Sequence, residues 1–436
     1  MSVSTELSQF IEDAIVIDTH EHMRKENEWV EGGPRDVLED LFRHYVNGDL
    51  ACAGAPPQVM ERLLDGADPD VEGRWAAIEP AWRAIQHTGY GETVRLKAAH
   101  VYGIDKITPA AMRASQPRLE ALRKPGQRLH LLRDLANLDH IQTDNGRRDV
   151  GPDGSGSDFF FYDISWLGFT YRGVDWALLE SETGVTVKDL RTLQQAFEAI
   201  FERHGRFAIA VKTQHAYLRT LRWEKRDDAD AERALQEMLK SIDDPDDATR
   251  LCIGDWCLAR GAELCAEHGL PMKIHTGTYG GNNRLFTERI AAGHLCPLLI
   301  EYPETRFVLM HIAYPYSEEL IALAKHFTNV WVDMCWAWSL SPQSSGDFLR
   351  RFLSSVPSNK LFAFGGDCSH PTTAYAYSLQ MRRHLARTLR AAIDDGDMTE
   401  SQAIDVAQRV LFNNQAACFD IEGTRAANLE MMAAST

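Results

Sequence analysis

The sequence predicts an α/β fold in which eight parallel strands alternate with helices and close into a (β/α)8 barrel. Three observations indicate this fold. The chain has 436 residues, enough for a complete barrel with insertions. Eight short apolar runs alternate with helical patterns along it. None of these runs is followed by a Gly-rich phosphate loop, which argues against an open doubly wound sheet.

The predicted strands are short apolar runs bounded by polar, glycine or proline residues. They lie at Ala14–Ile17, Asp139–Asn145, Asp158–Ile164, Phe207–Lys212, Met272–His275, Arg306–His311, Val330–Met334 and Lys360–Phe364.

Amphipathic helical patterns fill most of the intervals between the strands. Thr186–His204 stops at Gly205, and Pro34–Gly48 has proline at its start and glycine at its end. Asp347 is a candidate N-cap for a helix over 347–356. The other predicted helices are Ser4–Ala14, Asp227–Ile242, Thr249–His268, Ser317–Phe327, Tyr375–Asp394 and Glu400–Phe412.

The stretch from 47 to 135 departs from this alternation, because helical patterns follow one another there with no strand signal between them. We therefore expect a barrel made of residues 1–46 and 136–436, with a large helical insertion, 47–135, after strand 1. Segments that follow a strand lie at the C-terminal rim of a barrel, where active sites are found. The insertion is predicted to be a lid or an oligomerisation cap.

Composition limits the possible partners and location. The net charge of −17 argues against nucleic acid and anionic membrane surfaces. No apolar run approaches the roughly 18–20 residues of a membrane span, and no signal peptide is apparent. The eight cysteines form no CxxC pair, as expected for reduced thiols in a cytoplasmic protein.

A pair of histidines follows the first predicted strand. His20 and His22 are two residues apart, so on extended chain their side chains point the same way. Neutral imidazole is a frequent ligand for zinc, iron and manganese-type metals. A solvated turn that happens to hold two histidines is the alternative.

Further polar residues stand where other predicted strands end. In a barrel all strand C-termini converge on one rim, so these distant residues are expected to surround one cavity. They are Lys212, His275, His311 and Asp367.

On these positions the sequence resembles the amidohydrolase superfamily, and within it the amidohydrolase-2-like proteins. The resemblance covers about residues 10–46 and 136–415 and leaves out the helical insertion. The second half is similar to the amidohydrolase domain fused to glutamine synthetase-like proteins, and uronate isomerases are more distant relatives. The matching motifs are DTHEH (Asp18–His22), AVKT (Ala210–Thr213), KIHTG (Lys273–Gly277), LMHIAYPYSEE (Leu309–Glu319) and FGGD (Phe364–Asp367).

The resemblance implies one or two divalent ions per chain, zinc, manganese or iron. His20, His22 and Asp367 would hold the first ion. A carboxylated Lys212 would bridge to a second ion held by His275 and His311. Many relatives keep a single metal, and Lys212 would then be a cation that pairs with a substrate carboxylate. Asp367 and His311 are the expected catalytic residues, with Asp367 accepting a proton from water.

Five side chains that follow strand ends are candidates for substrate contact. Two of them are arginines, which could hold a carboxylate through paired hydrogen bonds. The five are Arg24, Tyr279, Arg284, Trp336 and His370.

The predicted function is that of a metal-dependent hydrolase acting on a small carbonyl compound. One alternative is a dinuclear iron or manganese/iron oxygenase that hydroxylates a small amino or carboxylic acid, as in the two-component α-aminoisobutyrate hydroxylase. A metal-dependent decarboxylase is another, and a catalytically inactive barrel serving as a subunit is a fourth. The expected partners are a small-molecule substrate and a second copy of the chain or a related subunit.

Overall fold

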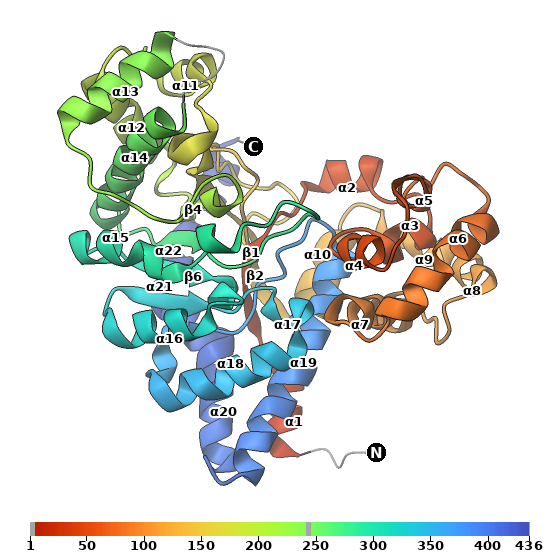
Figure 1. The fold of residues 1–436 in the computed structure, drawn as a ribbon. Coiled ribbons are helices and arrows are strands. Elements are labelled where there is room, and N and C mark those ends of the chain that lie inside the picture. The colour runs from red at the N-terminus through yellow and green to blue at the C-terminus, as the bar shows by residue number, and fades with distance from the viewer. Residues whose placement is uncertain (1–4, 241–245, 436) are drawn as a thin grey trace.

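The computed structural model describes residues 5–240 and 246–435. Eight parallel strands form one sheet in the order in which they occur along the chain, and helices surround it (Figure 1). The predicted (β/α)8 barrel is thereby confirmed. The strands are β1 (Val16–Glu21), β2 (Leu138–Thr143), β3 (Phe160–Ser165), β4 (Ala208–Thr213), β5 (Met272–His275), β6 (Phe307–Met310), β7 (Val330–Asp333) and β8 (Leu361–Phe362).

Backbone hydrogen bonds join the chain beyond β8 to β1 and so bring the two edges of the sheet together. The N–H of Thr19 donates to the carbonyl of Phe364 at 3.1 Å, and the N–H of Asp367 donates to the carbonyl of His20 at 2.8 Å. The strand that carries the paired histidines is therefore fixed directly to the loop that carries Asp367.

The helices of the barrel follow the strands. They are α1 (Glu6–Asp13), η3 (Gly168–Arg172), α11 (Trp176–Thr183), α12 (Leu190–His204), η4 (His215–Tyr217), α13 (Asp228–Lys240), α14 (Asp247–Glu267), η5 (Thr287–Arg289), η6 (Ala292–Leu295), α15 (Cys296–Glu301), η7 (His311–Ala313), α16 (Ser317–His326), α17 (Ala337–Leu340), α18 (Pro342–Ser355), η8 (Ser358–Lys360), α19 (Pro371–Asp394), α20 (Glu400–Gln408), η9 (Arg409–Asn413), α21 (Asn414–Cys418) and α22 (Ile421–Ser435).

The chain between β1 and β2 contains helices and loops only, and it forms the lobe on the right of Figure 1. Its role as a lid or an oligomerisation cap stays a prediction. Its helices are α2 (Glu26–Gly32), α3 (Val37–Phe42), α4 (Val46–Cys52), α5 (Pro57–Leu63), α6 (Val71–Ile85), α7 (Gly89–Leu96), η1 (Lys97–Val101), α8 (Pro109–Ala114), α9 (Gln116–Leu122), α10 (Gln127–Leu129) and η2 (His130–Leu135).

This helical lobe shares its hydrophobic core with the barrel. Leu38, Phe42 and Ile78 of the lobe belong to the same cluster of buried side chains as Ile17 and Val308 of the strands. Burying such side chains is the main source of folding free energy, at about 25 cal/mol per Å² of apolar surface. The lobe and the barrel are therefore expected to fold together.

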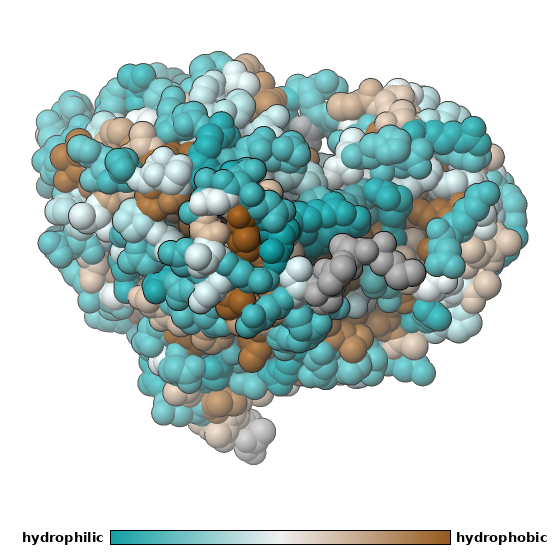
Figure 2. Space-filling view, turned by 90° about the horizontal axis from the view of Figure 1, so that it is seen from below, coloured by the Kyte–Doolittle hydropathy of each residue, from teal (hydrophilic) through white to brown (hydrophobic). Residues whose placement is uncertain are grey.

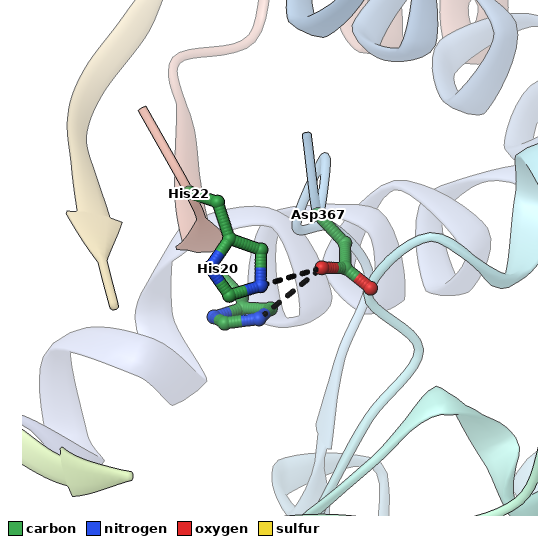
Figure 3. Close-up of side chains that lie close together, drawn as sticks. All are labelled: His20, His22 and Asp367. Carbon is green, nitrogen blue, oxygen red and sulfur yellow. Dashed lines mark ion pairs between the residues drawn. The ribbon is translucent and has the colours of Figure 1, made fainter. Parts of the chain in front are cut away.

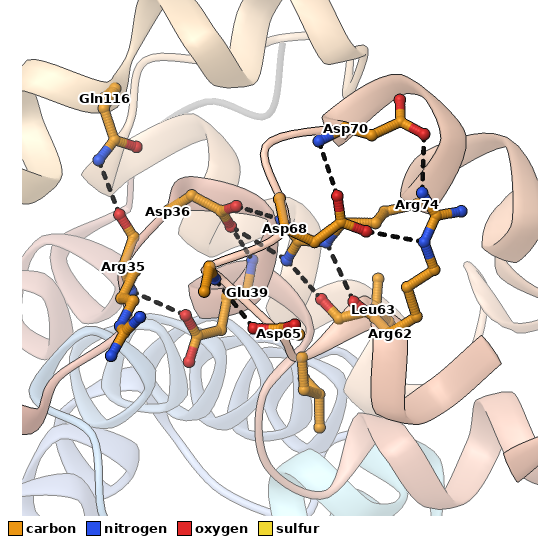
Figure 4. Close-up of polar contacts among 12 residues, drawn as sticks. Arg35, Asp36, Glu39, Arg62, Leu63, Asp65, Asp68, Asp70, Arg74 and Gln116 are labelled. Atoms are coloured by element: carbon orange, nitrogen blue, oxygen red, sulfur yellow. Dashed lines mark hydrogen bonds and ion pairs between the residues drawn. The ribbon is translucent and has the colours of Figure 1, made fainter. Parts of the chain in front are cut away.

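Polar contacts inside the lobe add to this packing (Figure 4). The buried guanidinium of Arg74 pairs with Asp36 and donates to the carbonyls of Leu63 and Asp68 at 2.7 and 3.0 Å. The guanidinium of Arg74 is thus paired with a carboxylate and with backbone carbonyls. This pairing offsets the free-energy cost of burying its charge.

Several boundaries differ from the prediction by a few residues; α12, for example, begins at Leu190 and not at Thr186. The predicted start at Ser4 and the predicted end at Ile242 lie outside the described residues. Two further differences have a visible cause. The helix expected over Pro34–Gly48 is divided into α3 and α4, because His44 between them adopts a φ of +91°, which no helix accommodates. Helix α18 begins at Pro342, with Ser341 as its N-cap, so Asp347 lies inside the helix and does not cap it.

The face seen from below is mostly hydrophilic, with hydrophobic residues scattered over it (Figure 2). Among residues 5–240 and 246–435, no helix combines the length and the apolar character needed to cross a membrane.

Candidate metal centre

Three side chains from the two ends of the chain converge at the C-terminal rim of the barrel (Figure 3). His20 is the second-last residue of β1, His22 lies just beyond the strand, and Asp367 lies in the loop after β8. The Nε2 atoms of His20 and His22 are 3.3 and 3.2 Å from the same oxygen, Oδ1 of Asp367. Two imidazole nitrogens and a carboxylate oxygen that meet in this way form a group able to hold a metal ion.

The second ring nitrogen of His22 determines which nitrogen is available as a ligand. Its Nδ1 lies 2.7 Å from the carbonyl oxygen of Asp144, which can only accept a hydrogen bond. Nδ1 therefore donates this hydrogen bond, which orients the ring so that Nε2 faces Asp367. Such outer hydrogen bonds orient metal-binding histidines.

The carboxylate of Asp18 supports the same group from beneath. Its Oδ1 accepts hydrogen bonds from the backbone N–H groups of His20 at 3.1 Å and Gly366 at 3.2 Å. Asp18 thus connects β1 to the loop that carries Asp367.

Several buried polar atoms around this group have no hydrogen-bond partner among the described residues. They include Oδ2 of Asp367, Nδ1 of His20 and both ring nitrogens of His311. Buried polar groups are almost always paired, so a concentration of unpaired ones indicates a missing ligand. The residues present therefore fit a divalent ion with its water or substrate.

A second group of potential ligands shares Asp367. The ligand atoms of His311, Cys335 and Asp367 lie within 4.8 Å of one another. Cys335 was not among the predicted ligands, although it directly follows the predicted strand Val330–Met334. Its burial raises the pKa of the thiol well above the usual value.

Lys212 and His275 lie beside these groups. The Nζ atom of Lys212 is 3.3 Å from Nε2 of His20. Nε2 of His275 is 3.0 Å from the carbonyl of Thr278, and its ring lies 4.1 Å from that of His311. The carboxylation of Lys212 and its bridging role stay predictions.

Burial sets the protonation of these ligands. It lowers the pKa of His20 and His311 well below the ordinary value and that of His275 to about 3. Burial alone would raise the pKa of Asp367, but hydrogen bonds and charges from His20 and His22 outweigh it, so this pKa lies well below its usual range. The carboxylate and neutral imidazoles are the forms that bind metals.

The backbone is strained where these ligands are held. His311, Cys335 and Asp367 have φ values of 70°, 48° and 51°, a region that residues other than glycine rarely adopt. Strain of this kind collects at functional sites. It accompanies tight packing, since a Cβ on Gly277 (φ 70°) would lie 2.5 Å from the backbone of Ala313.

The predicted substrate residues lie at different distances from the ligands. Trp336 is buried, its ring lies 5.7 Å from that of His311, and its Nε1 has no partner among the described residues. Tyr279 is buried and donates from its hydroxyl to the carbonyl of Arg284 at 2.7 Å. The ring of His370 faces Trp29 at 6.0 Å.

Neither predicted arginine has a carboxylate partner among the described residues. The exposed guanidinium of Arg284 donates to the carbonyl of Gly280 and lies 5.6 Å from the ring of Tyr217. Arg24 is exposed. Burial is the main cause that holds the pKa of His370 well below its ordinary value, and the charge of Arg24 makes a smaller contribution.

Sequence reasoning missed a contribution from the helical lobe. The ring of Tyr45 lies 4.0 Å from that of Trp336 and 4.1 Å from that of His44. Burial lowers the pKa of His44 to about 3, and the charge of Asp367 acts on it as well. The break between α3 and α4, where His44 lies, leaves no clear signal in the sequence.

Comparison with known proteins shows the family of the chain. The sequence profile described as "Amidohydrolase" matches residues 174–399. Protein fluG of Emericella nidulans is 28% identical over 205 residues, which are 45% of this chain and 24% of fluG. The chain thus spans about a quarter of the length of that relative.

The whole fold is similar to solved structures with little sequence identity. Uronate isomerase of Thermotoga maritima matches with a TM-score of 0.77 at 15% identity, over 95% of this chain and 96% of that one. Glucuronate isomerase of Caulobacter crescentus matches with a TM-score of 0.77 at 16% identity, over 94% and 92%. These spans include the helical lobe, which the sequence resemblance left out. With its profile match over half of the sequence and its eight-stranded barrel, the chain belongs to the amidohydrolase family of metal-dependent proteins.

Proposed function

We propose that the chain is a hydrolase that acts on a small carbonyl compound and uses one divalent ion held by His20, His22 and Asp367. The observation that carries this proposal is the convergence of two imidazole Nε2 atoms on Oδ1 of Asp367. When bound at such a site, a divalent ion lowers the pKa of a water molecule and polarises a carbonyl oxygen.

The residues of the chain supply the remaining functions. Oδ2 of Asp367 has no hydrogen-bond partner among the described residues, so it can accept a proton from water and pass it to a leaving group. Neutral His311 has no hydrogen bond at either ring nitrogen within the described part of the chain and can donate one to a developing oxyanion. The unpaired Nε1 of Trp336 offers a further donor beside it.

A substrate carboxylate would find cationic groups near this centre. Lys212 is buried within hydrogen-bond distance of His20, and Arg24 is exposed and has no carboxylate partner among the described residues. An acidic substrate would therefore be oriented by charge, even though the chain as a whole is negative.

A dinuclear oxygenase is the second candidate. The observation in its favour is that His311 and Cys335 form a second ligand group with the same carboxylate, Asp367. Two ions that share one carboxylate would suit iron or manganese/iron chemistry, with oxygen as co-substrate.

Metal analysis and product analysis of the purified chain test the proposal. We expect about one zinc or manganese ion per chain and, on a panel of small esters, lactones and amides, incorporation of ¹⁸O from labelled water into the product. Asp367→Asn should abolish this incorporation. Uptake of O2 by a chain with two iron ions would establish the oxygenase, and release of CO2 would establish a decarboxylase. Exchange of a substrate hydrogen with solvent, without incorporation of oxygen from water, would indicate isomerisation and would refute the hydrolase.

A further inference from the structure

A cleft of about 620 Å³ lies where the helical lobe meets two barrel helices, separate from the metal ligands. One face of each of three helices lines it. Helix α7 contributes Glu92 and Arg95, while α18 contributes Asp347 and Arg350. Helix α19 contributes Arg383, His384, Arg387, Thr388 and Ala391. A cleft of this volume is in the range that holds small molecules.

Arginines dominate the charge of this cleft. Arg95, Arg350, Arg383 and Arg387 line it together, against two carboxylates. The chain as a whole has the opposite balance, with 63 acidic and 46 basic residues. Four arginines around one cleft therefore stand out from the composition of the protein.

The carboxylates near the cleft are already engaged. Glu92 is 3.0 Å from Arg383 and 2.6 Å from His384. Asp347 accepts a hydrogen bond from Gln343 at 3.1 Å. Glu92 thus neutralises one arginine of the cleft.

Of the other three arginines, one is paired outside the cleft: Arg350 lies 2.8 Å from Asp395 and 2.5 Å from Asp397. The remaining two have no carboxylate partner in the described part of the chain. Arg95 and Arg387 are exposed, and neither has an ion-pair partner among the described residues. On α19, Arg387 lies four residues from Arg383, the spacing at which side chains on one face of a helix are neighbours. An anion in the cleft would balance the charge of Arg387, which no carboxylate among the described residues pairs with.

We propose that this cleft is a binding site for a small multivalent oxyanion, a phosphorylated or polycarboxylate metabolite. Arg95 of α7 and Arg387 of α19 would hold it through paired N–H···O bonds, the geometry in which guanidinium groups recognise phosphate and carboxylate. Because the two arginines come from the lobe and from the barrel, the anion would bridge these two parts.

Calorimetric titration of the full chain tests this site. The probes are inorganic phosphate, fructose 1,6-bisphosphate and tricarballylate, which separate the phosphate class from the polycarboxylate class. We expect one saturable site per chain for the bisphosphate or for the tricarboxylate. The affinity should be higher than for inorganic phosphate and should fall as salt is added. The Arg95→Gln/Arg387→Gln variant should bind about tenfold more weakly or worse.

Two control variants keep the result unambiguous. Arg222→Gln removes an exposed arginine elsewhere and should bind as the wild type does. His22→Ala disables the metal centre and should also leave this affinity unchanged. The proposal is overturned if no probe saturates, if the double variant binds like the wild type, or if His22→Ala abolishes binding. A failed hydrolase assay would leave these outcomes unaffected.

Discussion

The side-chain nitrogen of Lys212 lies 3.3 Å from Nε2 of His20. That ring nitrogen is the same one that faces Oδ1 of Asp367 at 3.3 Å. An N–H group in this place competes with a metal for the lone pair of His20, whereas a carbamate on Lys212 would offer oxygen ligands instead. The number of metal ions that the chain binds therefore tells whether Lys212 acts as a cation or as a bridging carbamate.

Lys212→Met separates these two roles. If one ion is held by His20, His22 and Asp367, the variant should keep about one ion per chain while kcat/KM falls by roughly 10–100-fold, as for outer-shell residues. Elemental analysis and steady-state kinetics measure both quantities, with Lys188→Met on the surface as control. A wild type with two ions and a variant with one would show instead that Lys212 bridges them.

His22→Ala should remove the metal. Because it deletes a direct ligand, the loss of metal affinity should exceed the ~10–100-fold typical of outer-shell partners. His326→Ala changes an exposed histidine at the end of α16 and serves as the matched control. Equal metal content in both variants would show that the convergence on Asp367 is not the binding site.

Gly280→Ala should displace Tyr45, the side chain of the helical lobe that lies beside Trp336. A Cβ at this position would lie 2.8 Å from Cε1 of Tyr45, so the tyrosine ring must move. We expect kcat/KM to fall about tenfold while metal content is unchanged. In Gly32→Ala the new methyl group meets nothing within 4 Å, so this variant should behave like the wild type. An unaltered Gly280→Ala enzyme would mean that Tyr45 does not shape the site.

Because of Glu92, the free energy of unfolding should depend on pH in the acid range. Partial burial opposes its ionisation, but hydrogen bonds from His384 and Gln380 outweigh burial and lower its pKa from 4.5 to about 2. Its carboxylate therefore stabilises the folded state above about pH 4.5, and this contribution disappears as the pH falls toward 2.

The variant Glu92→Gln isolates this contribution. At pH 7 its free energy of unfolding should be lower than that of the wild type by roughly 1–2 kcal/mol, a value discounted for solvent exposure. Denaturant titrations should show the difference shrinking below pH 4.5. A constant difference from pH 7 to pH 3 would contradict this assignment.

The sequence allowed the barrel to be predicted, and with it the convergence of His20, His22 and Asp367, because both depend on short-range patterns. His20 and His22 could be placed from the two-residue period of a strand, and Asp367 from the end of an apolar run. The burial of Cys335 and the break at His44 depend on contacts between distant segments. No local pattern encodes such contacts, so both residues were missed as parts of the site.

The core that Leu38 and Phe42 share with Ile17 and Val308 bears on how new specificities could arise in this protein. If the lobe of a relative replaced this one, its apolar face would pack against strand residues to which it is not fitted. Change of specificity should therefore proceed by paired replacements on both sides of the junction, and chimeras that exchange the lobe alone should fail to accumulate as folded protein.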